Sequence, residues 1–229
     1  MGIVLQVSNL SVVLDRKIIF EKINFALEEG QTLVVLGPNG AGKTVLLKAL
    51  IGLLPYQGEV LWKKKTKIGY VPQRVPLNRD IPISVAEFFQ LKKVSMNETV
   101  EILKQVGFAE SSIIGTQLGL LSSGQFQRVL IAWALVSQPD ILFFDEPTAG
   151  IDIGGEETIY DLLQAAKVKR NFSVILVTHD LSTVYTEATN VLCLNSKMSC
   201  YGPPEKILDP KNLQAIYGRE IKYFRHSHG

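Results

Sequence analysis

The chain has 229 residues, of which 46% are hydrophobic and 20% charged, so it is long enough for one domain with a substantial apolar core. The formal net charge of +2 is neither the strongly basic nor the strongly acidic balance that indicates a nucleic-acid or other polyionic partner. The longest apolar run, Val129–Val136, is too short to cross a bilayer, and the first residues lack the pattern of a secretory signal.

Residues 3–36 have the pattern of β-structure. The predicted strands are Ile3–Val7, Ile18–Leu27 and Thr32–Leu36, and Glu28–Gly30 makes the turn before the third strand. Four of the five residues of the third strand are apolar, which is typical of a buried strand in an α/β sheet.

A glycine-rich loop follows that buried strand and opens a helix predicted from about residue 42 to 52. Its glycines let backbone N–H groups surround phosphate oxygens, and the helix N-terminus adds partial positive charge. In this pattern the lysine reaches the β- and γ-phosphates, and the threonine binds Mg²⁺. The sequence therefore predicts a nucleoside triphosphate site at Gly37, Pro38, Asn39, Gly40, Ala41, Gly42, Lys43 and Thr44.

Pro55, Gly58 and the basic tract 63–67 predict a hairpin-like stretch after the first helix. A basic tract can also bind nucleic acid, but no aromatic residues are interleaved with these lysines, so a solvated hairpin is favoured. Gln73 stands where this β-rich part ends, and we expect its amide to sense the γ-phosphate or Mg²⁺.

Residues from about 74 to 138 are predicted to be mostly helical. Ser84–Glu87 is a capping box, and a second helix is expected from Asn97 to near Gly107. Leu121–Gln125 precedes a longer helix at Gly124–Val136. Its backbone donors and serine hydroxyls can bind anionic oxygens, although helix capping explains the serines equally well.

Strands and helices alternate again after residue 138. The pattern predicts strands at Ile141–Phe144 and Val174–Val177, with a helix at Glu156–Val168 between them. This alternation indicates a parallel sheet covered on both faces.

Functional residues are expected at the carboxyl ends of these strands, because open α/β sheets bind ligands there. Asp145 is predicted to hold Mg²⁺ through water, and Glu146 to act as the general base on an attacking water. His179 follows the later strand, and a neutral imidazole there can orient the γ-phosphate and the water. We expect Asp145 and His179 to share one edge of the sheet.

The two cysteines and the two C-terminal histidines are types of residue that bind metal ions, but for each pair an interpretation without a metal ion is favoured. Cys193 and Cys200 are the only cysteines and are expected to be reduced thiols rather than a disulfide. His226 and His228 could bind zinc, but no third ligand lies nearby, so a solvated terminus is favoured.

In this order the motifs resemble the ATP-binding cassette (ABC) ATPases over essentially the whole chain. Gly37–Thr44 resembles the Walker A loop, Gln73 the Q-loop glutamine, Leu121–Gln125 the signature loop, Ile141–Asp145 with Glu146 the Walker B strand and catalytic glutamate, Ala149–Asp152 the D-loop, and His179 the switch histidine. The signature loop discriminates this family from other ATPases with Walker loops.

The resemblance implies a single domain over residues 1–229 with an α/β P-loop NTPase core. Its parallel sheet is accompanied by an N-terminal antiparallel β subdomain and an inserted helical subdomain at about 74–138. It also implies ATP and Mg²⁺ as ligands, with Thr44, Gln73 and Asp145 at the metal. No nucleic-acid partner is expected.

The resemblance further implies that two copies pair head to tail. ATP then lies between Gly37–Thr44 of one copy and the signature loop of the other, where the residues expected to contact it are Ser122, Ser123, Gly124 and Gln125, with Asp152 of the D-loop. The expected partners are transmembrane permease subunits, which the helical segment grips, and a periplasmic or extracellular metal-binding protein. The expected location is the cytoplasmic face of the cell membrane, as a peripheral subunit.

Two residues depart from the family pattern. Ser123 replaces the first glycine of the usual Leu-Ser-Gly-Gly-Gln, and a left-handed backbone there would cost serine roughly 1 kcal/mol. Leu14 replaces an aromatic residue that stacks on adenine in most members, so adenine is expected to pack on an aliphatic surface.

A finer resemblance is to the ATPase subunits of bacterial zinc- and manganese-uptake importers, carried by Tyr70–Arg74, Val191–Asn195 and Cys200–Glu205. Zinc is favoured over manganese or iron as the transported ion. A non-transport ABC ATPase and a module that binds ATP but hardly hydrolyses it are the alternatives, and the presence of both Glu146 and His179 argues against the second.

Overall fold

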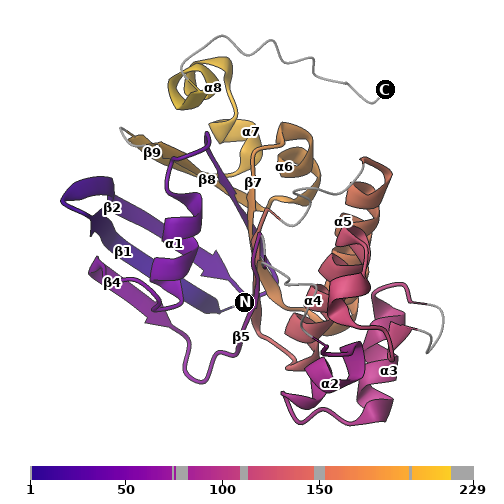
Figure 1. The fold of residues 1–229 in the computed structure, drawn as a ribbon. Helices are drawn as coiled ribbons and strands as arrows, with labels where there is room; N and C mark the ends of the chain where they lie inside the picture. The colour runs from indigo at the N-terminus through magenta and orange to yellow at the C-terminus, as the bar shows by residue number, and fades with distance from the viewer. Residues whose placement is uncertain are drawn as a thin grey trace. The chain divides into compact units, whose positions relative to one another are not determined.

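The computed structural model describes residues 2–73, 75, 82–108, 113–146, 153–195 and 198–217 (Figure 1). The chain divides into two compact units. The first unit is Met1–Val4, Glu28–Gly30 and Trp62–Ile175, and the second is Leu5–Leu27, Gln31–Leu61 and Leu176–Gly229. Each unit is built from segments that are distant in the sequence.

Long N-terminal strands form a three-stranded sheet of order β2-β1-β4, which lies mostly in the second unit. The strands are β1 at Ile3–Leu14, β2 at Lys17–Glu28 and β4 at Gln57–Trp62. Asp15 and Arg16 join β1 to β2 and both have positive φ, 49° and 61°. Two such residues make the tight turn that matches the twist of an antiparallel hairpin. The antiparallel β expectation is therefore confirmed, and β1 extends well beyond the predicted Val7.

A second strand group in the second unit is formed by β3 at Thr32–Leu36, β8 at Asn190–Asn195 and β9 at Met198–Gly202. β3 and β8 are parallel, and β8 and β9 are antiparallel. Every residue of β3 is buried. The helices of this unit are α1 at Lys43–Leu50, α6 at Leu181–Glu187, α7 at Pro204–Ile207 and α8 at Pro210–Tyr217.

The prediction of two reduced thiols is wrong, because the structure contains a disulfide between Cys193 and Cys200. The antiparallel register places these residues directly opposite each other, with their Cα atoms 4.9 Å apart. That separation lies within the range over which a disulfide can bridge two strands. Sequence spacing alone did not reveal the pairing.

The first unit contains the parallel pair β5 at Ile68–Val71 and β6 at Ile141–Asp145, and β7 at Ser173–Thr178 follows β6 in the strand order. Only Ser173–Ile175 of β7 belong to this unit. The hairpin expected around Pro55, Gly58 and the basic tract 63–67 does not form. β4 pairs with β1 and β5 pairs with β6, so the two strands that flank the lysine tract have different neighbours.

Helices dominate the first unit, as predicted for residues 74–138. They are α2 at Val85–Gln90, α3 at Met96–Gln105, the 3₁₀ turn η2 at Leu118–Leu120, α4 at Ser123–Val136 and α5 at Ile153–Arg170. The capping box at Ser84 is confirmed. A second capping box, of Ser95 and Glu98, starts α3 one residue earlier than the predicted Asn97.

Aromatic packing joins α2 to α4. The ring of Phe88 stacks on that of Trp133 at a centroid separation of 4.0 Å, and Phe89 meets the same indole edge-on at 5.7 Å. Lys92 Nζ lies 4.5 Å from the Trp133 ring centre and donates to the Trp133 carbonyl, so the end of α2 is held by a cation–π contact and a hydrogen bond.

None of the helices in the described ranges has the length and apolar character that a bilayer crossing needs.

Candidate functional site

The glycine-rich loop in the second unit is shaped by close backbone packing. A Cβ at Gly37 would lie 2.1 Å from the carbonyl oxygen of Leu194 on β8, so only glycine allows this approach. Gly42 has φ 93°, and a Cβ there would lie 2.6 Å from Ile19 Cγ2. The exposed tip of the loop, at Gly40, has nothing within 4 Å of its would-be Cβ. The loop is thus fixed at both ends and open at its tip.

Lys43 begins α1 directly after the loop and is 5% exposed. Its Nζ donates to the carbonyl oxygens of Gly37 and Pro38, at 2.9 and 3.2 Å. A buried ammonium held over the loop backbone is positioned to meet an anion bound by the same loop. Thr44 is the next helical residue, so its hydroxyl is presented from the first turn of α1.

His179 and Asp180 follow the end of β7, where the second unit continues into α6. Asp180 accepts hydrogen bonds from the backbone N–H groups of Ser182 and Thr183 and from both hydroxyls, and so caps α6. Burial opposes the charged form of Asp180, but these four hydrogen bonds outweigh it and lower the pKa of its carboxyl. This cap holds the exposed His179 between a strand end and a helix start.

In the first unit, Asp145 is the last residue of β6 and is 2% exposed. Sequence reasoning missed its partner Tyr70 on β5, which donates a hydrogen bond to the Asp145 carboxylate. Burial, followed by the charge of Asp145 and this bond, raises the pKa of Tyr70 to about 12. The only sequence signal for Tyr70 is its place at the end of a strand three residues before Gln73.

Gln73 and Glu146 are brought together in the first unit. Gln73 Nε2 donates to Glu146 Oε2 at 2.6 Å, although 72 residues separate the two in the sequence. Glu146 has a left-handed backbone, with φ 46°, immediately after β6. A strained backbone of this kind persists only where the surrounding structure holds it, and it is found at functional sites more than elsewhere.

The predicted signature loop forms the start of α4. The side chain of Ser122 accepts from the backbone N–H of Gln125 at 3.2 Å, and Gln125 Oε1 accepts from the backbone N–H of Ser122 at 3.0 Å. Ser123 is the first helical residue, so the left-handed backbone considered for it does not occur and carries no cost. Both serines and Gln125 are exposed, and a Cβ at Gly124 would meet nothing within 4 Å.

Several predicted residues lie outside the described ranges. They are Asp152 with the rest of the expected D-loop, and the histidines His226 and His228. Their roles, and the expectation that Asp145 and His179 share a sheet edge, stay predictions. Within the described ranges no group of three or more His, Cys, Asp or Glu side chains could hold a metal ion.

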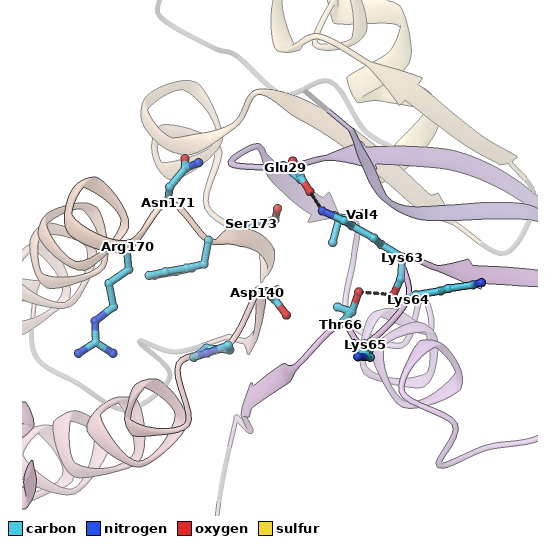
Figure 2. Close-up of a pocket in the computed structure, with 12 residues that line it drawn as sticks. Val4, Glu29, Lys63, Lys64, Lys65, Thr66, Asp140, Arg170, Asn171 and Ser173 are labelled. Atoms are coloured by element: carbon cyan, nitrogen blue, oxygen red, sulfur yellow. Dashed lines mark hydrogen bonds and ion pairs between the residues drawn. The ribbon is translucent and has the colours of Figure 1, made fainter.

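A cavity of about 260 Å³ opens in the first unit at the amino ends of β6 and β7 (Figure 2). Lys63 pairs with Glu29 beside it, and Asp140 Oδ2 accepts from the backbone N–H of Lys67 at 2.7 Å. Because Asp145 ends β6 and Asp140 precedes it, this cavity lies at the opposite edge of the strands from the candidate site. It contributes no residue to that site.

These features define a P-loop nucleoside triphosphatase. They are a buried strand, a glycine-rich loop whose backbone carbonyls hold a buried lysine, and a carboxylate at the end of a parallel strand. The chain matches the sequence model of the ABC transporter family over residues 20–149 and belongs to that family. It is therefore an ATP-binding subunit that hydrolyses ATP.

Individual members of this family are similar to the chain over most of its length. The chain is 35% identical to the zinc import ATP-binding protein ZnuC of Haemophilus influenzae, over 98% of this chain and 85% of the relative. It is 37% identical to a metal transport system ATP-binding protein of Thermotoga maritima, over 93% of this chain and 90% of the relative. The fold also superposes on an inward-facing, metal-chelate type ABC transporter with a TM-score of 0.84 and 28% identity, covering 94% of this chain and 89% of the other.

Proposed function

We propose that this chain powers a bacterial-type importer of a divalent metal ion, with zinc as the transported ion. The observation that carries the proposal is the near-full-length similarity to zinc import and metal transport ATP-binding proteins. The finer motifs at Tyr70–Arg74 and Val191–Asn195 point to the same group. The ion would cross through a separate permease, so this chain need not bind it.

Phosphate and Mg²⁺ recognition are assigned to the residues that the motifs single out. The backbone of Gly37–Thr44 and the Lys43 ammonium would bind the phosphates of ATP. Thr44, Gln73 and Asp145 would hold Mg²⁺, and a hydroxyl, an amide oxygen and a buried carboxylate are the hard oxygen ligands that this ion prefers. When bound, Mg²⁺ neutralises charge on the β- and γ-phosphates.

Glu146 is proposed as the general base, and His179 as the residue that orients the water and the γ-phosphate. In the described geometry the Glu146 carboxylate accepts from Gln73. A carboxylate engaged by an amide is less available to accept a proton, so hydrolysis requires this contact to loosen. That arrangement gives Gln73 a direct means of coupling hydrolysis to events at a partner protein.

A second copy of the chain would complete the site. Ser122, Ser123, Gly124 and Gln125 are exposed or half-buried at the start of α4, and Asp152 belongs to the same proposed interface. ATP between two copies would favour the closed dimer, and hydrolysis would release it. The assembly would include transmembrane permease subunits and an extracytoplasmic metal-binding protein, with this chain at the cytoplasmic face of the membrane.

The first experiments address ATP itself. Lys43→Ala should abolish tight ATP binding, because the loop loses its only buried ammonium, and equilibrium titration with a fluorescent ATP analogue measures this. Glu146→Gln should retain ATP binding but lose hydrolysis. Wild-type turnover by Glu146→Gln would refute the role of the glutamate, and wild-type affinity in Lys43→Ala would refute the role of the lysine.

The transported ion is tested in the assembled complex. The permease that co-purifies with this chain is reconstituted in liposomes with its binding protein, and ATPase activity is measured with Zn²⁺, Mn²⁺ and Fe²⁺. Stimulation by Zn²⁺ above the other two ions supports the proposal. Preference for Mn²⁺ or Fe²⁺ would indicate an importer for that ion, and failure of any permease to co-purify would favour a non-transport ABC ATPase.

A further inference from the structure

Tyr70 and Asp145 lie on adjacent parallel strands in a register that brings their side chains to one face. Tyr70 on β5 is the register partner of Phe143 on β6, and Asp145 follows two residues later. Side chains on a strand alternate between faces, so Phe143 and Asp145 project from the same face of β6 as Tyr70 does from β5. A tyrosine is long enough to reach this diagonal neighbour, and its hydroxyl donates to the carboxylate.

The contact satisfies a carboxylate in a buried position. Asp145 is 2% exposed, and a buried carboxylate needs hydrogen-bond donors to remain charged. A tyrosine hydroxyl carries its proton at neutral pH, so in this pair Tyr70 is the donor and the Asp145 carboxylate is the acceptor. Hydrogen bonds to a charged acceptor are the stronger kind, and they restrict its rotamer.

We propose that Tyr70 is a positioning residue that orients the Asp145 carboxylate for Mg²⁺. The inference rests on the proposed role of Asp145 in the function above. A carboxylate has about four acceptor positions, so one donor fixes its orientation and leaves the others for the ion or its water. Tyr70 itself would touch neither ATP nor Mg²⁺. Residues that orient a metal ligand in this way typically change metal affinity by about 10- to 100-fold when they are mutated.

The test uses Tyr70→Phe, which removes only the hydroxyl. The Mg²⁺ concentration for half-maximal ATPase activity should rise about tenfold. In a Glu146→Gln background, titration with ATP should show an unchanged affinity without Mg²⁺ and a weaker gain in affinity when Mg²⁺ is added. The matched control is Tyr56→Phe, which should leave both measurements at wild-type values because Tyr56 is an exposed residue.

A double-mutant cycle tests whether Tyr70 affects the Mg²⁺ requirement through Asp145. With Asp145→Asn as the background, Tyr70→Phe should add no further change in the Mg²⁺ requirement, because the group that it orients is already altered. An unchanged Mg²⁺ requirement in the single variant, an additive effect in the double variant, or an equal loss of ATP affinity with and without Mg²⁺ would each overturn the proposal. If the wild-type protein hydrolyses ATP without needing Mg²⁺, the proposed function of Asp145 fails instead.

Discussion

Replacing Gly37 with alanine tests whether the phosphate-binding loop depends on its close contact with β8. The added Cβ would lie 2.1 Å from the carbonyl oxygen of Leu194 and 3.2 Å from its carbonyl carbon. Both atoms belong to the backbone of a buried strand, so no side-chain rotation can relieve the clash. Gly37 does not have the positive φ that three other glycines near α1 adopt, so the cost is one of space rather than of backbone conformation.

The distances around Gly37 set the size of the expected losses of stability and of ATPase rate. A carbon–oxygen contact is ordinarily about 3.3 Å or longer, so loop and strand must separate by about 1 Å. Overpacking of this kind destabilises a fold by about 1–3 kcal/mol. A 1 Å misplacement of groups that position a substrate can lower the rate by about 100-fold. We therefore expect Gly37→Ala to lose about 1–3 kcal/mol of unfolding free energy and about 100-fold in ATPase rate.

Urea unfolding and steady-state ATPase measurements check the two expectations. Gly52→Ala is the matched control, because Gly52 has φ 77° and nothing within 4 Å of its would-be Cβ. This control should lose about 1–2 kcal/mol from the left-handed backbone and keep its ATP affinity. If Gly37→Ala binds and hydrolyses ATP as the wild type does, the contact between loop and strand has no bearing on the site.

Three further predictions concern local contacts. Ser95→Ala and Ser122→Ala each remove a helix cap and should each lower the unfolding free energy by about 1 kcal/mol. Only Ser122→Ala should also lower the ATPase activity. Equal ATPase activities in the two variants would contradict the role of the signature loop. Reducing the Cys193–Cys200 disulfide, which closes a separation of seven residues, should lower the unfolding free energy by about 2 kcal/mol, so identical thermal midpoints before and after reduction would contradict it. Folding lowers the pKa of Asp180, so its charged side chain stabilises the protein above pH 3.8, and this stabilisation is lost as the pH falls below that value. The difference in unfolding free energy between wild type and Asp180→Asn should therefore become smaller in acid. Urea unfolding at a series of pH values measures this difference, and a constant difference would contradict the prediction.

Features that depend on neighbouring residues were predictable from the sequence. The loop Gly37–Thr44 is contiguous, and its flanking strand and helix are confirmed. The capping box at Ser84 is confirmed as well, and so is the strand predicted at Ile141–Phe144, which extends one residue further to Asp145. In each case the hydrogen bonds or the burial pattern that shape the feature are set within a few residues, so spacing and residue type contain the needed information.

Strand pairing was the part that the sequence did not determine. The stretch with Pro55, Gly58 and the basic tract 63–67 has hairpin composition, but β4 and β5 take different neighbours, because a strand pairs with whichever partner buries its apolar face. The disulfide was missed for the same reason, since only the register of β8 and β9 sets Cys193 opposite Cys200.

The sequence by itself determined that this chain binds and hydrolyses ATP, because the chemistry of the phosphates is met by short motifs with fixed spacing. Only the tertiary structure decided which groups hold those motifs in place. The Leu194 carbonyl that requires glycine at position 37 and the Tyr70 hydroxyl on Asp145 come from distant strands. Contacts of this kind depend on which strands become neighbours and in what register, and that choice is made by burial of the whole core rather than by local pattern.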